Sequence, residues 1–91
     1  MTDRPKARPD LETRTVDDET VILDRDGERI HQLNATASFI WDRCDGERDA
    51  TAIAAELAEA FGVEPDQTVK DVSEIVLQFS ALGLLEEVGV E

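Results

Sequence analysis

Short apolar runs separated by polar breaks fill the first third of the sequence. Residues 12–16, 20–23 and 29–33 are rich in threonine and β-branched or alternating apolar side chains, a composition typical of short strands. Gly27, in the break before the third run, is expected to supply the positive φ of a tight turn. The pattern predicts three short antiparallel strands.

From residue 34 onward the apolar spacing becomes helical. Asn34 is a good N-cap, and a stripe at i, i+3, i+4 and i+7 follows it until residues 45–46, Asp-Gly, stop the helix. A second helix begins at a cap formed by Asp49 or Thr51 and ends at Gly62. Its predicted buried stripe is Ile53, Ala54, Leu57 and Phe61.

A third helix is predicted from Pro65 to the C-cap Gly83. Proline suits the first helical position, and Asp66 lies beside the positive end of the helix dipole. The apolar stripe of this helix comprises Val69, Val72, Val76 and Phe79, widened by Ile75 and Leu82, and Leu84 and Leu85 fold back onto the core. Strands first and helices second predict an α+β domain.

The first nine residues differ in composition from the rest of the chain. They contain three basic residues and two prolines with almost nothing apolar, so they bury too little surface to offset the entropy of ordering. We therefore expect a disordered tail over residues 1–9 and one folded domain over residues 10–88.

The charge of the chain limits its partners. Lys and Arg number 9 against 22 Asp and Glu, which gives a formal net charge of −13. Such a field repels phosphate backbones and anionic lipid surfaces, so nucleic acid and membranes are not expected partners. No run approaches the ~20 apolar residues of a membrane span, and the N-terminus lacks the apolar segment of a secretory signal. We expect a cytoplasmic protein.

The sequence offers little for catalysis or metal binding. One cysteine and one histidine exclude an internal disulfide, a multi-cysteine metal site and a histidine cluster. Cys44 lies on the apolar stripe of the first helix and is expected in the core, and His31 is expected to be a half-exposed strand residue. Asp24 and Asp26 flank a turn, but the remaining ligand spacing of a calcium loop is absent. We expect no catalytic residues, metal or cofactor.

Three features remain as candidates for binding. Trp41 lies on the stripe of the first helix and is expected in the core. Lys70 either recognises a ligand carboxylate or pairs with Asp66 or Glu74 on its own helix. The predicted strand 29–33 either accepts an extended peptide at a sheet edge or is a charged edge that avoids aggregation.

An ordered set of residues runs through the predicted elements. It begins with Leu-Asn-Ala-Thr-Ala-Ser-Phe-Ile-Trp at residues 33–41 and continues with Asp-Gly at 45–46. Phe-Gly-Val at 61–63, Asp-Val at 71–72 and Leu-Gly-Leu-Leu at 82–85 complete it. This set resembles the PqqD family, the small peptide chaperones of coenzyme PQQ biosynthesis, and the resemblance covers roughly residues 12–87.

The resemblance implies a winged-helix-like fold, with a three-stranded antiparallel sheet followed by three helices. It also implies a recognition element for ribosomally synthesised and post-translationally modified peptides (RiPPs). Such an element binds the leader of a precursor peptide and presents it to a modifying enzyme, a radical-SAM enzyme in the PQQ pathway. The leader adds as a strand beside the third strand and packs against the third helix.

Carried onto this sequence, the resemblance implies a peptide site on two elements. The implied residues are Arg29, Ile30, His31, Gln32 and Leu33 on the strand and Val69, Lys70, Val72, Ser73 and Val76 on the helix. Relatives often have aromatic residues at positions 30 and 31, so Ile30 and His31 imply a different or weaker leader anchor.

Two other functions compete with this interpretation. A winged-helix DNA-binding regulator has a similar topology but needs Arg and Lys on its recognition helix, where this chain has one Lys among Asp66, Asp71 and Glu74. A scaffold subunit would contact only another protein. The acidic body fits a basic face on a partner enzyme or a salt-adapted host equally well, and the sequence leaves a monomer and a weak homodimer both open.

Overall fold

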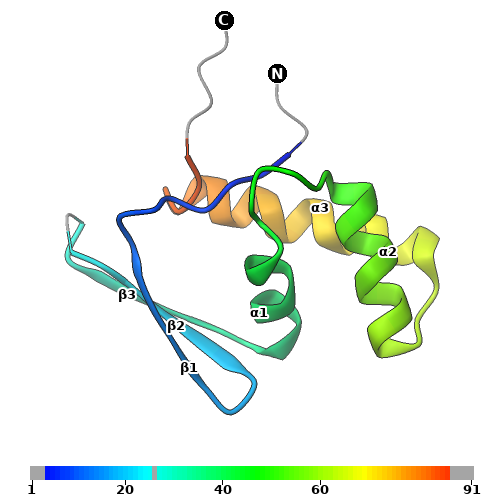
Figure 1. Cartoon of the computed structure of the whole chain (residues 1–91), viewed down its shortest axis with the longest axis horizontal. Coiled ribbons are helices and arrows are strands. Elements are labelled where there is room, and N and C mark those ends of the chain that lie inside the picture. The colour runs from blue at the N-terminus through cyan, green and yellow to red at the C-terminus, as the bar shows by residue number, and fades with distance from the viewer. Residues whose placement is uncertain (1–3, 26, 87–91) are drawn as a thin grey trace, which may run out of the picture.

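The computed structural model describes residues 4–25 and 27–86. Within them the elements follow the predicted order (Figure 1): β1 (Glu12–Val16), β2 (Glu19–Asp24), β3 (Arg29–Leu33), α1 (Ala35–Asp42), α2 (Ala50–Phe61) and α3 (Pro65–Ala81). The expected α+β fold, a three-stranded antiparallel sheet followed by three helices, is confirmed.

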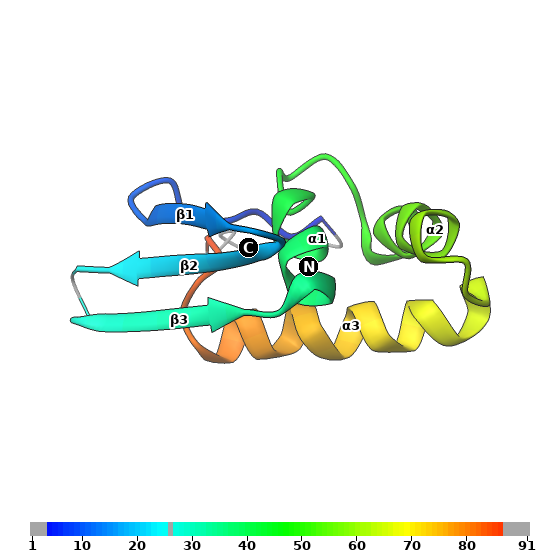
Figure 2. The same ribbon diagram turned by 90° about the horizontal axis from the view of Figure 1, so that it is seen from below.

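The sheet has the order β1-β2-β3, with both neighbouring pairs antiparallel. α1 stands against one end of the sheet and connects it to α2 and α3, which pack against each other. Figure 2 shows α3 on the β3 side of the molecule, away from β1. β3 and β1 are therefore the two edges of the sheet, and they face different surroundings.

The turn between β2 and β3 uses glycine for a different reason from the one expected. The positive φ in this turn belongs to Glu28, at 54°, and not to Gly27. The Gly27 N–H instead donates to Oδ1 of Asp24 at 3.2 Å, and a Cβ on Gly27 would come within 3.0 Å of that carboxylate. Gly27 is needed here for close approach to Asp24 rather than for a left-handed conformation.

The helix ends follow from capping chemistry. The side chain of Asn34 accepts from the Ala37 N–H at 2.8 Å to begin α1. Asp49, rather than Thr51, caps α2 by accepting from the Ala52 N–H at 2.8 Å. Gly62 ends α2 in the left-handed conformation, at φ 67°, which glycine adopts without steric cost.

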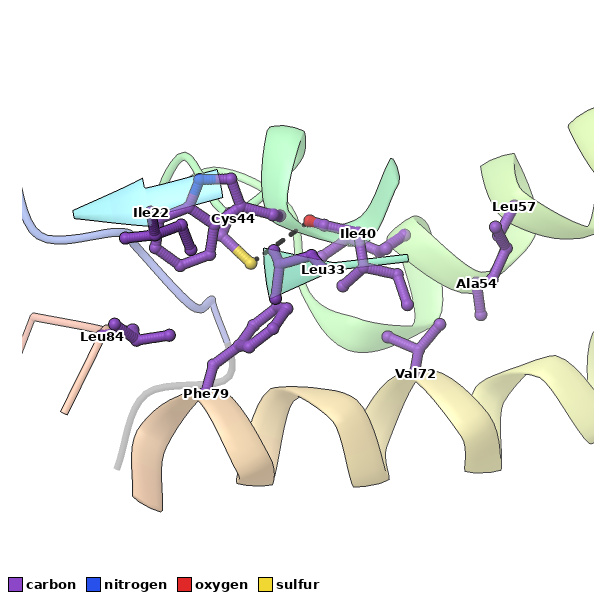
Figure 3. Packing of buried hydrophobic residues seen from close by; sticks show 11 residues of the cluster. Ile22, Leu33, Ile40, Cys44, Ala54, Leu57, Val72, Phe79 and Leu84 are labelled. Carbon is purple, nitrogen blue, oxygen red and sulfur yellow. Dashed lines mark hydrogen bonds between the residues drawn. The ribbon is translucent and has the colours of Figure 1, made fainter. Parts of the chain in front are cut away.

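The core lies where all three helices meet the inner face of β2 and the end of β3. Figure 3 shows Phe79 and Val72 projecting from α3 towards side chains of α1, α2 and the sheet. Trp41 packs its ring edge-on against Phe79, with centroids 5.3 Å apart. Both Trp41 and Cys44 are buried, as expected. The predicted stripe of α2 is buried except for Phe61, which is 46% exposed.

The N-terminal segment differs from the expected disordered tail. Its backbone joins two distant parts of the chain: Ala7 donates to the carbonyl of Cys44 at 2.9 Å, and Arg8 donates to that of Leu84 at 3.0 Å. The Pro5 carbonyl accepts from Gly46 at 3.0 Å, and the Lys6 carbonyl from Glu86 at 2.7 Å.

Composition did not reveal this pairing, because backbone groups carry it and any side chain can accompany them. Residues 5–8 therefore belong to the hydrogen-bonded fold rather than to a disordered tail. Residues 1–3, 26 and 87–88 of the predicted segments lie outside the described residues.

Burial of Cys44 makes the free energy of unfolding depend on pH in the alkaline range. Burial in the core raises the pKa of the Cys44 thiol from about 9 to about 12, and the negative charges of Asp45 and Asp42 add to the shift. The Sγ atom also donates to the Ile40 carbonyl at 3.3 Å. At pH values below the thiol's pKa in the unfolded chain, the buried neutral thiol contributes its full stabilisation. This contribution is lost as the pH rises towards the pKa of about 12 in the folded protein.

We therefore expect the free energy of unfolding of the wild type to fall relative to that of Cys44→Ala. The difference should change by about 1.4 kcal/mol per pH unit, starting near pH 9. Urea titrations of both proteins at several pH values between about 8 and about 11 measure it. Parallel curves for the two proteins would show that the thiol ionises equally in both states.

Candidate functional site

The outer edge of β3 has backbone groups without partners in the sheet. Ser38 Oγ accepts from the Thr20 N–H at 2.8 Å and donates to the Leu33 carbonyl at 3.2 Å, so these two backbone groups face each other across β2 and β3. Groups on an antiparallel strand point alternately to either side. The N–H and C=O groups of Ile30 and Gln32 therefore point away from β2, towards the open edge.

The side chains of β3 divide between the two faces of the sheet. His31 pairs with the fully buried Ile22, Leu33 with Thr20, and Arg29 with Asp24, so these three side chains lie on the face that the helices cover. Ile30 and Gln32 lie on the opposite face. Ile30 is 71% exposed there, and Gln32 donates to Glu19 at 3.0 Å.

The structure divides the five β3 residues of the implied site between the two faces of the sheet. The helix side receives the side chains of Arg29, His31 and Leu33, whereas Ile30 and Gln32 contribute their backbone. Leu33 is itself buried in the core. The Nε2 atom of His31 is buried and has no hydrogen-bond partner among the described residues, which is rare for a buried polar atom.

The α3 residues of the expected site occupy three different environments. Val72 is 0% exposed and belongs to the core, so it cannot touch a ligand. Val69, Ser73 and Val76 are half-buried beside it. Lys70 is exposed and lies about 200° around the helix from Val72, on the face away from the core.

Lys70 forms no ion pair with Asp66 or Glu74 in the described part of the chain. Its position also separates it from a peptide packed between β3 and the inner side of α3. The structure therefore brings together the edge of β3 with Val69, Ser73 and Val76, and it leaves Val72 and Lys70 outside that group.

The backbone of α3 does not approach β3 as closely as a neighbouring strand would. The Cα atoms of β3 and α3 are everywhere more than 8 Å apart, although α3 lies on the β3 side of the molecule (Figure 2). Neighbouring strands need a spacing of only ~4.8 Å. α3 therefore does not occupy the position that hydrogen bonds from Ile30 and Gln32 would give to a further strand.

Exposed leucines on α3 were not among the expected site residues. Leu77 is 68% exposed and Leu82 is also exposed, and isolated exposed leucines are common on protein surfaces. The sequence analysis placed Leu82 on the buried stripe of the third helix. Leu77 lies off that stripe in the sequence, and this position could have predicted its exposure. Both extend the apolar surface of the second half of α3.

Chemistry beyond binding has little support in the described part of the chain. It contains no group of three or more His, Cys, Asp or Glu side chains placed to hold a metal ion. The Cys44 thiol is buried, and its raised pKa keeps it protonated and unreactive at neutral pH. No helix within residues 4–25 and 27–86 is long and apolar enough to cross a membrane.

The described residues thus form a three-stranded sheet with an open edge, supported by three helices. A protein-family model described as coenzyme PQQ synthesis protein D (PqqD) matches residues 19–85 of the sequence. The chain belongs to the PqqD family. None of the curated proteins matches the sequence significantly.

Three solved structures share this fold. TbiB1 in complex with the TbiA(beta) leader peptide is 20% identical, with a TM-score of 0.81 over 93% of this chain and 99% of that chain. A lasso peptide synthetase B1 complexed with its leader peptide is 24% identical, with a TM-score of 0.80 over 92% and 99%.

The third is the PqqD truncation of Methylobacterium extorquens PqqCD, described as a functional, stand-alone RiPP recognition element. It is 18% identical, with a TM-score of 0.71 over 91% of this chain and 88% of that chain. At these identities the likeness establishes the fold.

Proposed function

We propose that this chain binds the leader of a ribosomally made precursor peptide and presents it to a modifying enzyme. The leader adds as a strand to β3. The observation that carries the proposal is the unpaired backbone of Ile30 and Gln32 at an edge that α3 leaves open. Membership of the PqqD family and the two leader-peptide complexes of similar fold support it.

Backbone hydrogen bonds and side-chain contacts make different contributions to leader binding. The N–H and C=O groups of Ile30 and Gln32 offer four hydrogen bonds, each worth a net ~0.5–1.5 kcal/mol, which set the register of the leader. Alternate leader side chains then point towards α3 and pack against Val69 and Val76, at about 25 cal/mol per Å² of apolar surface removed from water.

Selectivity for polar leader residues comes from the β3 side chains on the same face. Arg29 is exposed at the start of β3 and offers five N–H donors to a leader carboxylate. We expect a leader with an acidic residue near Arg29 and apolar residues facing α3.

The proposal also concerns the class of modifying enzyme that receives the leader. In a PQQ-like pathway it is a radical-SAM enzyme, and the PqqD family match supports that pathway. Two of the similar structures are a TbiB1 complex and a lasso peptide synthetase component, so a lasso-type pathway is the second candidate. A radical-SAM gene or a cyclase gene beside this one distinguishes them.

An NMR titration of ¹⁵N-labelled protein with the leader encoded by a neighbouring precursor gene tests the proposal. We expect saturable shifts at the amides of Arg29–Leu33 and of the half-buried α3 residues. The amides of Ile30 and Gln32 should move downfield and become protected from hydrogen exchange, because they gain hydrogen-bond acceptors. No shift at millimolar peptide would instead favour a scaffold that contacts only another protein.

The same labelled protein tests the DNA-binding alternative. The exposed face of α3 carries Lys70 beside Asp71 and Glu74, a charge balance that repels phosphates. We expect no shifts on adding duplex DNA at low salt, where even non-specific binders associate. Shifts on α3 under those conditions would favour the regulator.

A further inference from the structure

A second concave surface lies on the helix side of the sheet, near the β1 edge. It is a hollow of about 420 Å³ between the turn that joins β1 to β2, one side of α1 and the end of α2. No residue of β3 or α3 lines it. The lining residues are Thr15, Asp17, Asp18, Thr20, Ala35, Ser38, Phe39, Asp42, Ala60 and Phe61.

The rim of the hollow carries three carboxylates without a cation. Asp17, Asp18 and Asp42 form no ion pair with any described basic residue. Arg43 is next to Asp42 in sequence, but its Nε donates to Glu56 at 2.9 Å. That hydrogen bond is the main reason that the pKa of Glu56 lies below its ordinary value. Arg43 is therefore paired with Glu56 rather than with Asp42.

The wall of the hollow is aromatic. Phe39 and Phe61 meet edge to face, with centroids 5.6 Å apart, and Phe61 remains 46% exposed although it is a large apolar residue. The Arg43 guanidinium lies 3.5 Å from the centroid of the Phe39 ring, so this ring already binds one cation through its π face.

The floor contains a polar group without a partner. Thr20 lines the hollow and is only 2% exposed. Its N–H donates to Ser38 Oγ, but its side-chain hydroxyl makes no hydrogen bond with any described residue. Among the described residues only Nε2 of His31 is both buried and unpartnered, so the Thr20 hydroxyl keeps some accessible surface, and we expect it to offer a hydrogen bond to whatever enters the hollow.

We propose that this hollow receives an arginine side chain from the modifying enzyme. The aliphatic stem packs against Phe39 and Phe61, the guanidinium reaches the carboxylates of Asp17, Asp18 and Asp42, and the Thr20 hydroxyl accepts one N–H. Arginine fits better than lysine because its planar fork pairs with two carboxylate oxygens and tolerates an aromatic surface.

This inference rests on the proposed function, because it gives the enzyme a docking surface separate from the peptide site. The two surfaces lie on different elements, so one molecule can hold the leader at β3 and the enzyme at the β1–β2 turn together. Val16 is 62% exposed and lies in sequence between the lining residues Thr15 and Asp17.

The first experiment titrates the ¹⁵N-labelled full chain with N-acetyl-L-argininamide. We expect saturable shifts confined to the lining residues, and an affinity about tenfold lower in Asp17→Asn/Asp42→Asn, equivalent to about 1.4 kcal/mol. Asparagine tolerates the left-handed conformation of Asp17, at φ 57°, so the variant should keep its fold.

The matched control is Asp66→Asn/Asp71→Asn, which removes the same charge from the exposed face of α3. It should bind N-acetyl-L-argininamide within about twofold of the wild type, a difference of only about 0.4 kcal/mol. Shifts spread over all acidic surfaces, or equal losses in the two double variants, would mean that the amide senses only the net charge and would overturn the site.

The second experiment assigns the occupant. The Asp17→Asn/Asp42→Asn variant should bind the purified modifying enzyme from the neighbouring gene about tenfold more weakly, with unchanged affinity for the leader. If the leader competes with N-acetyl-L-argininamide, the hollow extends the peptide site and the enzyme assignment is wrong. If the leader does not bind the wild type, the proposed function fails, whereas the first experiment still decides whether the hollow binds arginine.

Discussion

Ile30→Pro is expected to weaken leader binding while leaving the domain folded. Proline has no N–H, and the N–H of Ile30 points to the open edge, so the substitution deletes a donor that the sheet itself does not use. The leader carbonyl opposite is then left unpaired, at a cost of about 1–3 kcal/mol. That corresponds to a loss of affinity of about 5- to 150-fold, measured by isothermal titration calorimetry with the leader peptide.

The matched control for this variant is Ile30→Ala. Alanine keeps the N–H and removes only a side chain that lies on the face opposite the helices and is 71% exposed. We expect it to bind within about threefold of the wild type, because no more than about 0.7 kcal/mol of contact is lost. If alanine weakens binding as much as proline does, the leader contacts the outer face of the sheet instead of extending β3.

Removal of residues 1–8 is expected to destabilise the domain more than any surface substitution. The four backbone hydrogen bonds that join residues 5–8 to distant parts of the chain disappear, each with a net value of ~0.5–1.5 kcal/mol. Arg8 also lies 3.5 Å from the largely buried carboxylate of Asp24 and donates to the Gly83 carbonyl at 2.8 Å. Loss of that cation leaves a buried charge uncompensated.

The expected loss is about 2–4 kcal/mol after the entropy of ordering the segment is subtracted. For a domain of this size the melting temperature should fall by at least about 8 °C, which calorimetry measures. Deletion of residues 1–3 alone is the matched control and keeps every one of these bonds. Equal melting temperatures for the two truncated proteins would mean that residues 5–8 add nothing to stability.

The order of the elements was predictable because each leaves a local signature. Asn34, Pro65 and Gly62 mark helix ends through the chemistry of a cap, a fixed φ and a left-handed residue, and these signals act within a few residues. The apolar stripes of the helices likewise placed Trp41 and Phe79 in one core. Local signals of this kind can be recognised in the sequence without knowledge of the tertiary structure.

The division of the site between faces was harder to predict. A one-residue shift in register reverses which side chains of a strand meet the helices, so the family resemblance could name residues 29–33 as a groove lining but could not assign each side chain to a face. The same limit applies to Val72 and Lys70, whose roles depend on how α3 is rotated against the core. The pairing of residues 5–8 left no signature at all, because backbone groups carry it.

The bond from Glu86 to Lys6 has a consequence for the topology of the chain. These residues are 80 positions apart in sequence, yet the Glu86 N–H donates to the Lys6 carbonyl at 2.7 Å. The described chain thus nearly closes into a ring, a condition under which circular permutation is tolerated. A short linker between these ends, with new termini in the β2–β3 turn, would keep β3 and α3 in one continuous chain and make β3 its first strand.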